Sequence, residues 1–141
     1  MANTLKLNVL SPERRFLDQA EVQSVTLPGS EGQIQILPDH VAMIGTLETG
    51  IFSYERTSGE KVVGAISTGF FEIKDGQLSV MAETIEMGDE IDLTRAKKAQ
   101  LKSESALQDA ALEPEQFRKY QLKLQRALIR QQVAGRDHGE Q

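Results

Sequence analysis

Alternation between apolar and polar residues dominates the first ninety or so positions of the chain. Residues 4–9 alternate with a period of two, which is typical of a half-buried strand. The same pattern, bounded by Pro, Gly and Asp turn signals, predicts further strands over 14–18, 21–27, 33–37, 51–56, 61–67, 69–74, 77–81 and 83–86. Residues 38–47 lose the pattern after Pro38, and we predict a loop there. Val22, Val25 and Leu27 break strict alternation, which indicates a bulge or burial on both faces.

The clearest local signal is the hairpin turn at Asp75-Gly76, between two short alternating segments. Asp-Gly supplies the positive φ angles that a tight two-residue connection requires. Eight to ten short strands with frequent turns favour a β-sandwich or flattened barrel. A segment of about ninety residues is long enough to bury a core of this kind and to fold alone.

After residue 90 the apolar period changes to that of a helix. Asp92 is a suitable N-cap for a first helix from Leu93 to about residue 110, in which small residues such as Ala and Ser recur. Pro114 fits the first position of a second helix that runs to about Val133. The apolar stripe of this second helix consists of Phe117, Tyr120, Leu124, Ala127 and Leu128.

The predicted fold class is therefore α+β. An N-terminal β-sandwich or flattened barrel (residues 1–87) precedes a C-terminal antiparallel two-helix hairpin (88–135) and a disordered tail (136–141). Because the hairpin has few large apolar residues, we expect it to dock weakly on the sandwich, and a weakly docked element can act as a switch.

Composition excludes several classes of function. The chain has no Cys and two His, so thiol chemistry and a His-rich metal site are excluded. It has no Walker A phosphate loop, no acid, base and nucleophile set, no signal or transit peptide, and no apolar run of the roughly 20 residues that span a bilayer. A cytoplasmic protein is expected.

Charge is unevenly distributed along the chain. Residues 1–90 carry 6 basic and 14 acidic residues, whereas residues 91–141 carry 10 basic and 7 acidic ones. Lys119, Lys123, Arg126 and Arg130 share one stripe of the second helix, which is either a solvated face or an anion-binding surface. Folding the hairpin at residues 110–114 brings Arg95 and Lys102 near these arginines, beside two carboxylates, those of Glu86 and Asp92.

At these positions the chain resembles the epsilon subunits of bacterial F-type ATP synthases, from about Leu5 to Val133. The sandwich carries Val25-Thr-Leu-Pro-Gly-Ser-Glu-Gly32, Leu37-Pro-Asp-His40 and Gly69-Phe-Phe-Glu-Ile73, and the helical part carries Asp89-Glu-Ile-Asp-Leu-Thr-Arg-Ala96. The resemblance implies a non-catalytic central-stalk rotor subunit, peripheral on the cytoplasmic face of the bacterial inner membrane, that couples proton flow to ATP synthesis. The sandwich would contact the gamma subunit and the c-ring, and the extended hairpin would reach the alpha and beta subunits and inhibit ATP hydrolysis.

The resemblance also implies site residues. Contact with the c-ring and gamma subunit falls on Glu31, Gln33, Pro38, Asp39, His40 and Met43. In some members ATP binds the folded hairpin as a regulatory ligand, with no cofactor and no Mg²⁺ required by any motif; the matching positions are Glu86, Ile91, Asp92, Arg95, Ala96, Lys102, Arg126 and Arg130. Lys102 replaces an Arg of ATP-binding members and lacks its planar fork, and the loop Asp39-His-Val-Ala42 departs from a common Gly-His-Ala-Pro pattern.

Two alternatives stay open at this stage. Asp92 could serve only as a helix cap, with the cations solvated rather than ligand-binding. The chain could also be a freestanding ATP-sensing module whose hairpin closes on nucleotide. No nucleic acid partner and no membrane insertion are expected.

Overall fold

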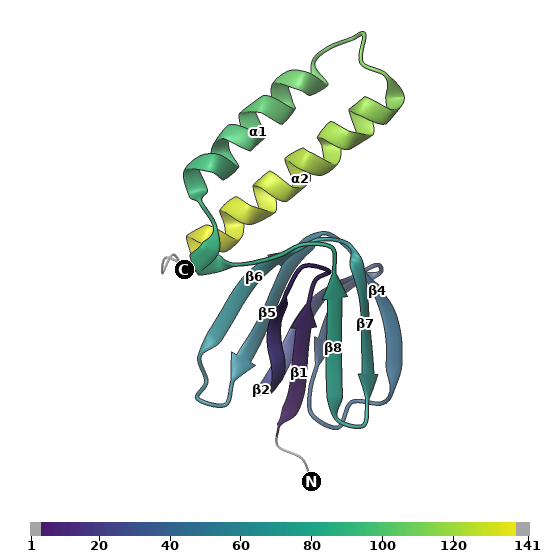
Figure 1. Ribbon diagram of the computed structural model, residues 1–141, viewed down its shortest axis with the longest axis vertical. Coiled ribbons are helices and arrows are strands. Elements are labelled where there is room, and N and C mark those ends of the chain that lie inside the picture. The colour runs from purple at the N-terminus through teal and green to yellow at the C-terminus, as the bar shows by residue number, and fades with distance from the viewer. Residues whose placement is uncertain (1–3, 138–141) are drawn as a thin grey trace.

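The computed structural model describes residues 4–137 and contains a β-rich part followed by two helices (Figure 1). The strands are β1 (Leu5–Leu10), β2 (Arg15–Gly29), β3 (Gly32–Ile36), β4 (Met43–Leu47), β5 (Gly50–Arg56), β6 (Lys61–Ile66), β7 (Gly69–Lys74), β8 (Gln77–Ala82) and β9 (Ile85–Met87). The short 3₁₀ helix η1 (Gly88–Glu90), α1 (Leu93–Leu107) and α2 (Pro114–Asp137) follow. The predicted fold class is confirmed.

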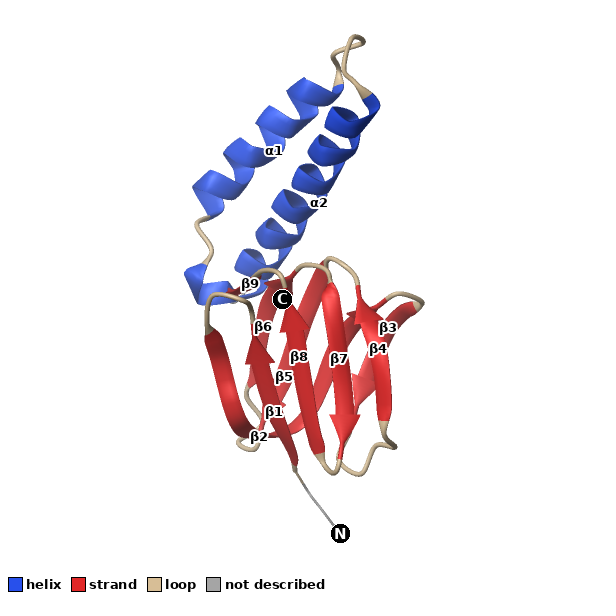
Figure 2. Cartoon of the chain, turned by 45° about the vertical axis from the view of Figure 1, so that its right-hand side comes forward, coloured by secondary structure: helices blue, strands red, loops and turns tan. Residues whose placement is uncertain are grey.

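The strands form one continuous sheet that folds over into two layers (Figure 2). In one layer β1 pairs in parallel with β8, and β7 and β4 continue the order. In the other, β2 lies between β3 and β5, and β6 and β9 follow. The first half of β2 also pairs antiparallel with β1, so this long strand passes from one layer to the other and closes one side of the sandwich.

Two predicted strands, 14–18 and 21–27, are in fact the single strand β2. The break between them is a bulge at Gln19, whose φ is +53° and whose backbone N–H donates to Asn8 Oδ1 at 2.8 Å. A bulge bends a strand without ending it, so the chain changes direction while the pairing continues. The predicted irregularity within 21–27 is confirmed, because the register between β2 and β5 shifts between Val22 and Ser24.

The predicted loop over 38–47 is wrong in its second half, where β4 pairs antiparallel with β7. In β4 only Leu47 is buried, whereas Ile44 is 71% exposed. A short strand that buries so little has no alternating pattern by which the sequence could reveal it.

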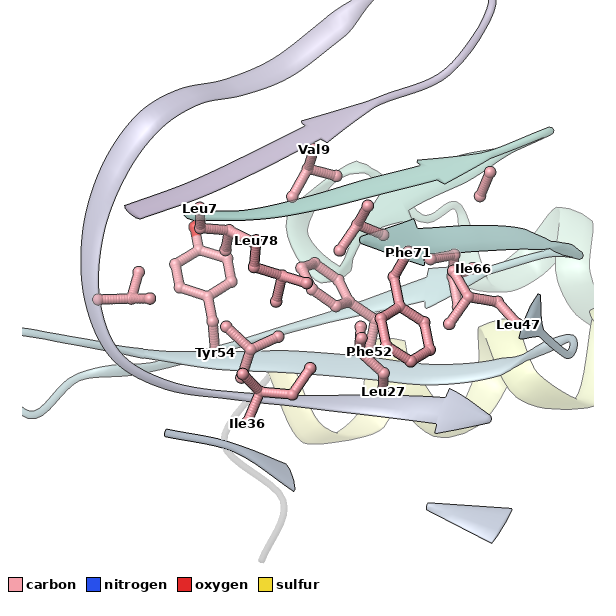
Figure 3. Close-up of a cluster of buried hydrophobic side chains, with 14 of the residues drawn as sticks. Leu7, Val9, Leu27, Ile36, Leu47, Phe52, Tyr54, Ile66, Phe71 and Leu78 are labelled. Carbon is pink, nitrogen blue, oxygen red and sulfur yellow. The ribbon is translucent and has the colours of Figure 1, made fainter. Parts of the chain in front are cut away.

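The main core lies between the two layers (Figure 3). Phe52 and Phe71 are its largest fully buried side chains. Among the residues that the structure describes, all buried members of this core come from β1 to β9 and none from a helix. The Asp75-Gly76 turn between β7 and β8 has φ angles of +52° and +75°, as the sequence predicts. Because the main core is built from strand residues, the sandwich has a complete core of its own.

The hairpin stands on one end of the sandwich and projects away from it (Figures 1 and 2). α1 ends at Leu107 rather than near residue 110, because Asp109 Oδ1 accepts a hydrogen bond from the Ala111 N–H and forms a turn. α2 continues to Asp137, so the predicted tail is wrong at 136 and 137, while 138–141 lie outside the described residues. Val133 and Ala134 are fully buried, and this packing stabilises the last turns despite Gly135.

Candidate functional site at the junction of sandwich and hairpin

A second, smaller apolar core joins the hairpin to the sandwich. Its buried members are Val63, Ala65, Ile91, Val133 and Ala134, and Ile51, Leu93 and Ile129 pack around them. They come from β5 and β6, from the linker between β9 and α1 (residues 88–92), from the first residue of α1 and from the C-terminal half of α2. This group, called here the junction core, shares no buried residue with the main core. The hairpin therefore docks through a few apolar side chains, which lie near the C-terminal end of α2 and at the start of the helical part.

An ion pair between β9 and α2 adds to this contact. Arg130 Nη2 donates to Glu86 Oε2 at 2.8 Å, and Arg130 Nε lies 2.5 Å from Glu86 Oε1. The Nε contact is electrostatic only, because this buried N–H makes no well-directed hydrogen bond. The two side chains are 31% and 34% exposed, so solvent screens the pair only partly. The pair thus ties α2 to the sheet edge next to the junction core.

A cavity of about 300 Å³ lies beside this ion pair. Arg126, Arg130 and Glu86 contribute the charged part of its lining. The remaining wall is formed by Thr49, Ala65, Ile66, Ser67, Thr84 and Ile129. Ser67 and Thr84 bond to each other, since the Ser67 hydroxyl accepts from the Thr84 N–H at 2.8 Å. Two guanidinium groups beside a partly apolar wall suit an anion that carries an apolar portion.

The structure brings together only some of the sequence-predicted nucleotide residues. Glu86, Arg126 and Arg130 line the cavity, whereas Arg95 and Lys102 are exposed and do not line it. The three hydroxyl residues of the cavity wall (Thr49, Ser67 and Thr84) were not predicted. They are far apart in sequence and belong to no motif, so only the sheet pairing brings them together.

The start of α1 is built as predicted. Asp92 Oδ1 accepts a hydrogen bond from the Arg95 N–H at 3.1 Å, which caps the helix. Ile91 is 6% exposed and belongs to the junction core, and Ala96 is fully buried. Three of the predicted nucleotide-binding residues therefore have structural roles here: Ile91 in packing, Asp92 in capping and Ala96 in close helix contact.

The two helices meet through small and polar residues. Ala96 and Ser103 are the buried residues of α1, and Ala127 is buried on α2. Gln131 Nε2 donates to Gln100 Oε1 at 2.7 Å across the helix pair. The predicted apolar stripe of α2 is only partly covered, because Phe117 and Leu128 are each 41% exposed. The helix pair thus has a thin interface, as expected from the small residues of α1.

The residues predicted to contact partners lie on or next to β3 and β4, and β3 is at the opposite edge of its layer from β9. Glu31, Gln33, Asp39 and Met43 are exposed, and Pro38 and His40 are half-buried. The same segment also exposes large apolar side chains that were not singled out from the sequence, namely Leu37 (50%), Val41 (75%) and Ile44 (71%). Isolated exposed apolar residues are common. Together with Met43, however, these three make four exposed apolar residues within eight positions, which is a surface suited to a partner.

Within residues 4–137, no helix is long and apolar enough to cross a membrane. In the same range no three His, Asp or Glu side chains come close enough together to hold a metal ion.

Comparison with known proteins agrees with the two-part architecture. Residues 4–88 match the family model of the ATP synthase delta/epsilon chain β-sandwich domain, and residues 89–135 match that of its long α-helix domain. The ATP synthase epsilon chain of Trichlorobacter lovleyi is 40% identical over 136 residues, which is 96% of this chain and 97% of that one. The corresponding chain of Geobacter sulfurreducens is 39% identical with the same coverage.

Solved structures show the same fold at low identity. A chain of the Euglena gracilis mitochondrial ATP synthase (OSCP/F1/c-ring) superposes with a TM-score of 0.82 at 22% identity, covering 92% of this chain and 80% of that one. A chain from the central stalk/c-ring of the Tetrahymena thermophila mitochondrial ATP synthase gives 0.59 at 13% identity, with 94% of both chains covered. Since both family models and the bacterial relatives span nearly all of the described residues, this chain belongs to the ATP synthase delta/epsilon family, as the sequence predicted.

Proposed function

We propose that this chain is the central-stalk epsilon subunit of a proton-translocating ATP synthase, in which the sandwich is a fixed rotor part and the hairpin is a movable inhibitor of ATP hydrolysis. It works as a non-catalytic subunit on the cytoplasmic face of the inner membrane. The observation that carries this proposal is the separation of the junction core from the main core. Because the described helical residues (93–135) contribute nothing buried to the main core, the hairpin can leave while the sandwich stays folded.

The exposed segment 37–44 is the proposed contact with the c-ring, next to a contact with the gamma subunit. Its apolar side chains, with Val41 the most exposed at 75%, would lose water on docking, which is favourable. Asp39 within this segment and Glu31 near it are exposed carboxylates that can accept hydrogen bonds from polar loops of a partner. The relatives of known structure come from assemblies described as F1/c-ring and central stalk/c-ring, which supports partners of this kind.

In the released state the basic stripe of α2 would meet an acidic surface of the beta subunit. Lys119, Lys123 and Arg126 are exposed on α2, whereas Arg130 is paired with Glu86 in the docked state. Release separates Arg130 from Glu86, so the stripe then carries one more unpaired cation to attract an acidic surface.

The cavity beside the ion pair is the proposed site of ATP as a regulatory ligand. Arg126 and Arg130 would bind phosphate oxygens, and a ligand bound to both α2 and the sheet would favour the docked hairpin. Arg130 already contacts Glu86, so a phosphate must compete with this carboxylate or share the guanidinium with it. The same cavity, lined by both α2 and the sheet, favours the alternative function, a freestanding ATP sensor whose hairpin closes on nucleotide.

The test of inhibition is removal of residues 91–141 from the assembled synthase. Hydrolysis of ATP should rise, because the inhibitory element is gone, and assembly should be retained, because the sandwich keeps its core. Unchanged hydrolysis by a normally assembled complex would show that the hairpin does not inhibit.

A separate test concerns nucleotide. Calorimetric titration of the isolated chain with ATP should show binding that Arg126→Ala weakens. Lys119→Ala is the matched control, since Lys119 lies on the same basic stripe but does not line the cavity. If the unmodified chain shows no response up to millimolar ATP, both the regulatory ligand and the freestanding sensor are excluded, and the stalk function stands.

A further inference from the structure

The β1–β2 turn makes a second, independent contact with the linker that leads into α1. Arg14 Nη2 donates to Glu90 Oε2 at 3.0 Å, across 76 positions of sequence. Glu90 lies in η1, the last element before the helices, and its other oxygen accepts a hydrogen bond from the Met87 N–H at 3.1 Å. One carboxylate therefore joins the end of β9, the linker and a distant turn of the sandwich.

Both ends of this contact are held in place. The turn is closed by the Ser11 N–H, which donates to the Arg14 C=O at 2.9 Å, and by the Arg14 N–H, which donates to Ser11 Oγ at 3.3 Å. The guanidinium of Arg14 stacks over the ring of Phe16 at 3.9 Å, a cation–π contact. Since the turn and the ring fix the cation, less side-chain freedom is lost when Glu90 binds it.

The position of this ion pair gives it a role that the other exposed pairs lack. Ile91, the residue after Glu90, is buried in the junction core, and Asp92 begins α1. The linker is thus held on one side by the apolar contact with α2 and on the other by Arg14. Movement of the hairpin must turn about this linker, because it is the only covalent connection between sandwich and helices.

We propose that Arg14 and Glu90 form a clamp on the hinge of the hairpin, with Arg14 as a positioning residue that favours the docked state. The inference rests on the proposed function, because it assumes that the hairpin leaves the sandwich. Asp89 lies with Arg14 and Glu90 in a second surface pocket, distinct from the cavity beside Arg130, and offers a second carboxylate. Substitution of Arg14 therefore removes the clamp more completely than substitution of Glu90. Both side chains are partly exposed, at 56% and 37%, so the clamp shifts the equilibrium modestly and weakens with salt.

The experiment measures the docked fraction from the distance between two spin labels, by pulsed electron–electron double resonance. The labels are placed at Lys74→Cys on β7 and Gln121→Cys on α2. The chain contains no Cys, so both labels are specific. Arg14→Gln should raise the ratio of released to docked hairpin about two- to five-fold at low salt. Glu90→Gln should have an equal or smaller effect, and the double variant should add nothing to Arg14→Gln.

Arg15→Gln is the matched control. Arg15 is as exposed as Arg14, but it pairs at 3.1 Å with Asp18 of the same strand, on the surface of the sandwich. Val133→Asp is the positive control, because it places a charge in the junction core. If Val133→Asp releases the hairpin and Arg14→Gln does not, or if Arg15→Gln has the same effect as Arg14→Gln, the clamp is refuted and the mobile hairpin stands. If Val133→Asp leaves the hairpin docked, both proposals fail, because there is no release for a clamp to oppose.

Discussion

Val133 gives the most direct test of how the hairpin is held. Its side chain is fully buried in the junction core, against residues of β6 and the linker. Val133→Ala removes two carbons, which at about 0.8 kcal/mol each corresponds to about 1.6 kcal/mol of lost transfer free energy. Because every 1.4 kcal/mol is a factor of about ten, the ratio of released to docked hairpin should rise about 15-fold.

The substitution separates docking from helix formation. Ala has a higher helix propensity than Val, so α2 itself is not weakened, and any loss must come from contacts outside the helix. Leu122→Ala is the matched control on the same helix, since Leu122 is 42% exposed and lies outside both cores. It should leave docking unchanged.

Hydrogen exchange measured by mass spectrometry reports the two parts separately. In the released state the helices have lost their packing on the sheet, so their backbone hydrogen bonds open more readily. In Val133→Ala, the amides of α1 and α2 should therefore exchange up to about 15-fold faster, while those of β1, β7 and β8 keep their protection because the main core is untouched. Equal acceleration in strands and helices would refute the reasoning, since it would mean that the two cores open as one unit. No acceleration anywhere would mean that Val133 does not hold the hairpin.

Three further predictions concern the polar contacts and the exposed segment. Glu86→Gln should weaken docking of α2 a few-fold in the same exchange experiment, because it removes the charge that pairs with Arg130. Glu60→Gln should not, because the pair that it breaks, with Arg56, lies on the surface of the sandwich. Asp92→Ala should destabilise the first turn of α1 by about 1 kcal/mol through loss of the N-cap, seen as faster exchange of the amides from 93 to 96 and no change in α2. Ile44→Asp should reduce incorporation into the synthase, measured by pull-down. The thermal midpoint of the isolated chain should stay the same, because this side chain is 71% exposed. A lowered midpoint with normal incorporation would contradict the proposed contact.

The sequence predicts those parts of the fold in which local chemistry and burial agree. Asp75-Gly76 fixes the β7–β8 hairpin, and Asp92 and Pro114 fix the starts of both helices. It fails where a distant contact decides. β4 is a strand only because β7 lies beside it, and α2 passes Gly135 only because the preceding residues are buried on the sheet.

The candidate site is predictable to a similar extent. Glu86, Arg126 and Arg130 were expected together and do line one cavity, because helix periodicity places the two arginines on one face. Arg95 and Lys102 were placed beside them by folding the hairpin at residues 110–114 and by the family resemblance, and both lie outside the cavity lining. The Arg14–Glu90 contact has no local signal, since it depends on where the β1–β2 turn ends relative to η1.

The distribution of buried residues suggests which part of the hairpin is held least. α1 buries only Ala96 and Ser103, and its hydrogen bond to α2 joins two neutral amides, Gln100 and Gln131. The end of α2, in contrast, buries Val133 and Ala134 and carries the Arg130 ion pair to the sheet. Separation of α1 from α2 therefore exposes little apolar area, and the contacts between α2 and the sheet form the larger barrier to extension. A ligand or partner that acts on the sheet side of α2 would thus control the hairpin more strongly than one that acts between the helices.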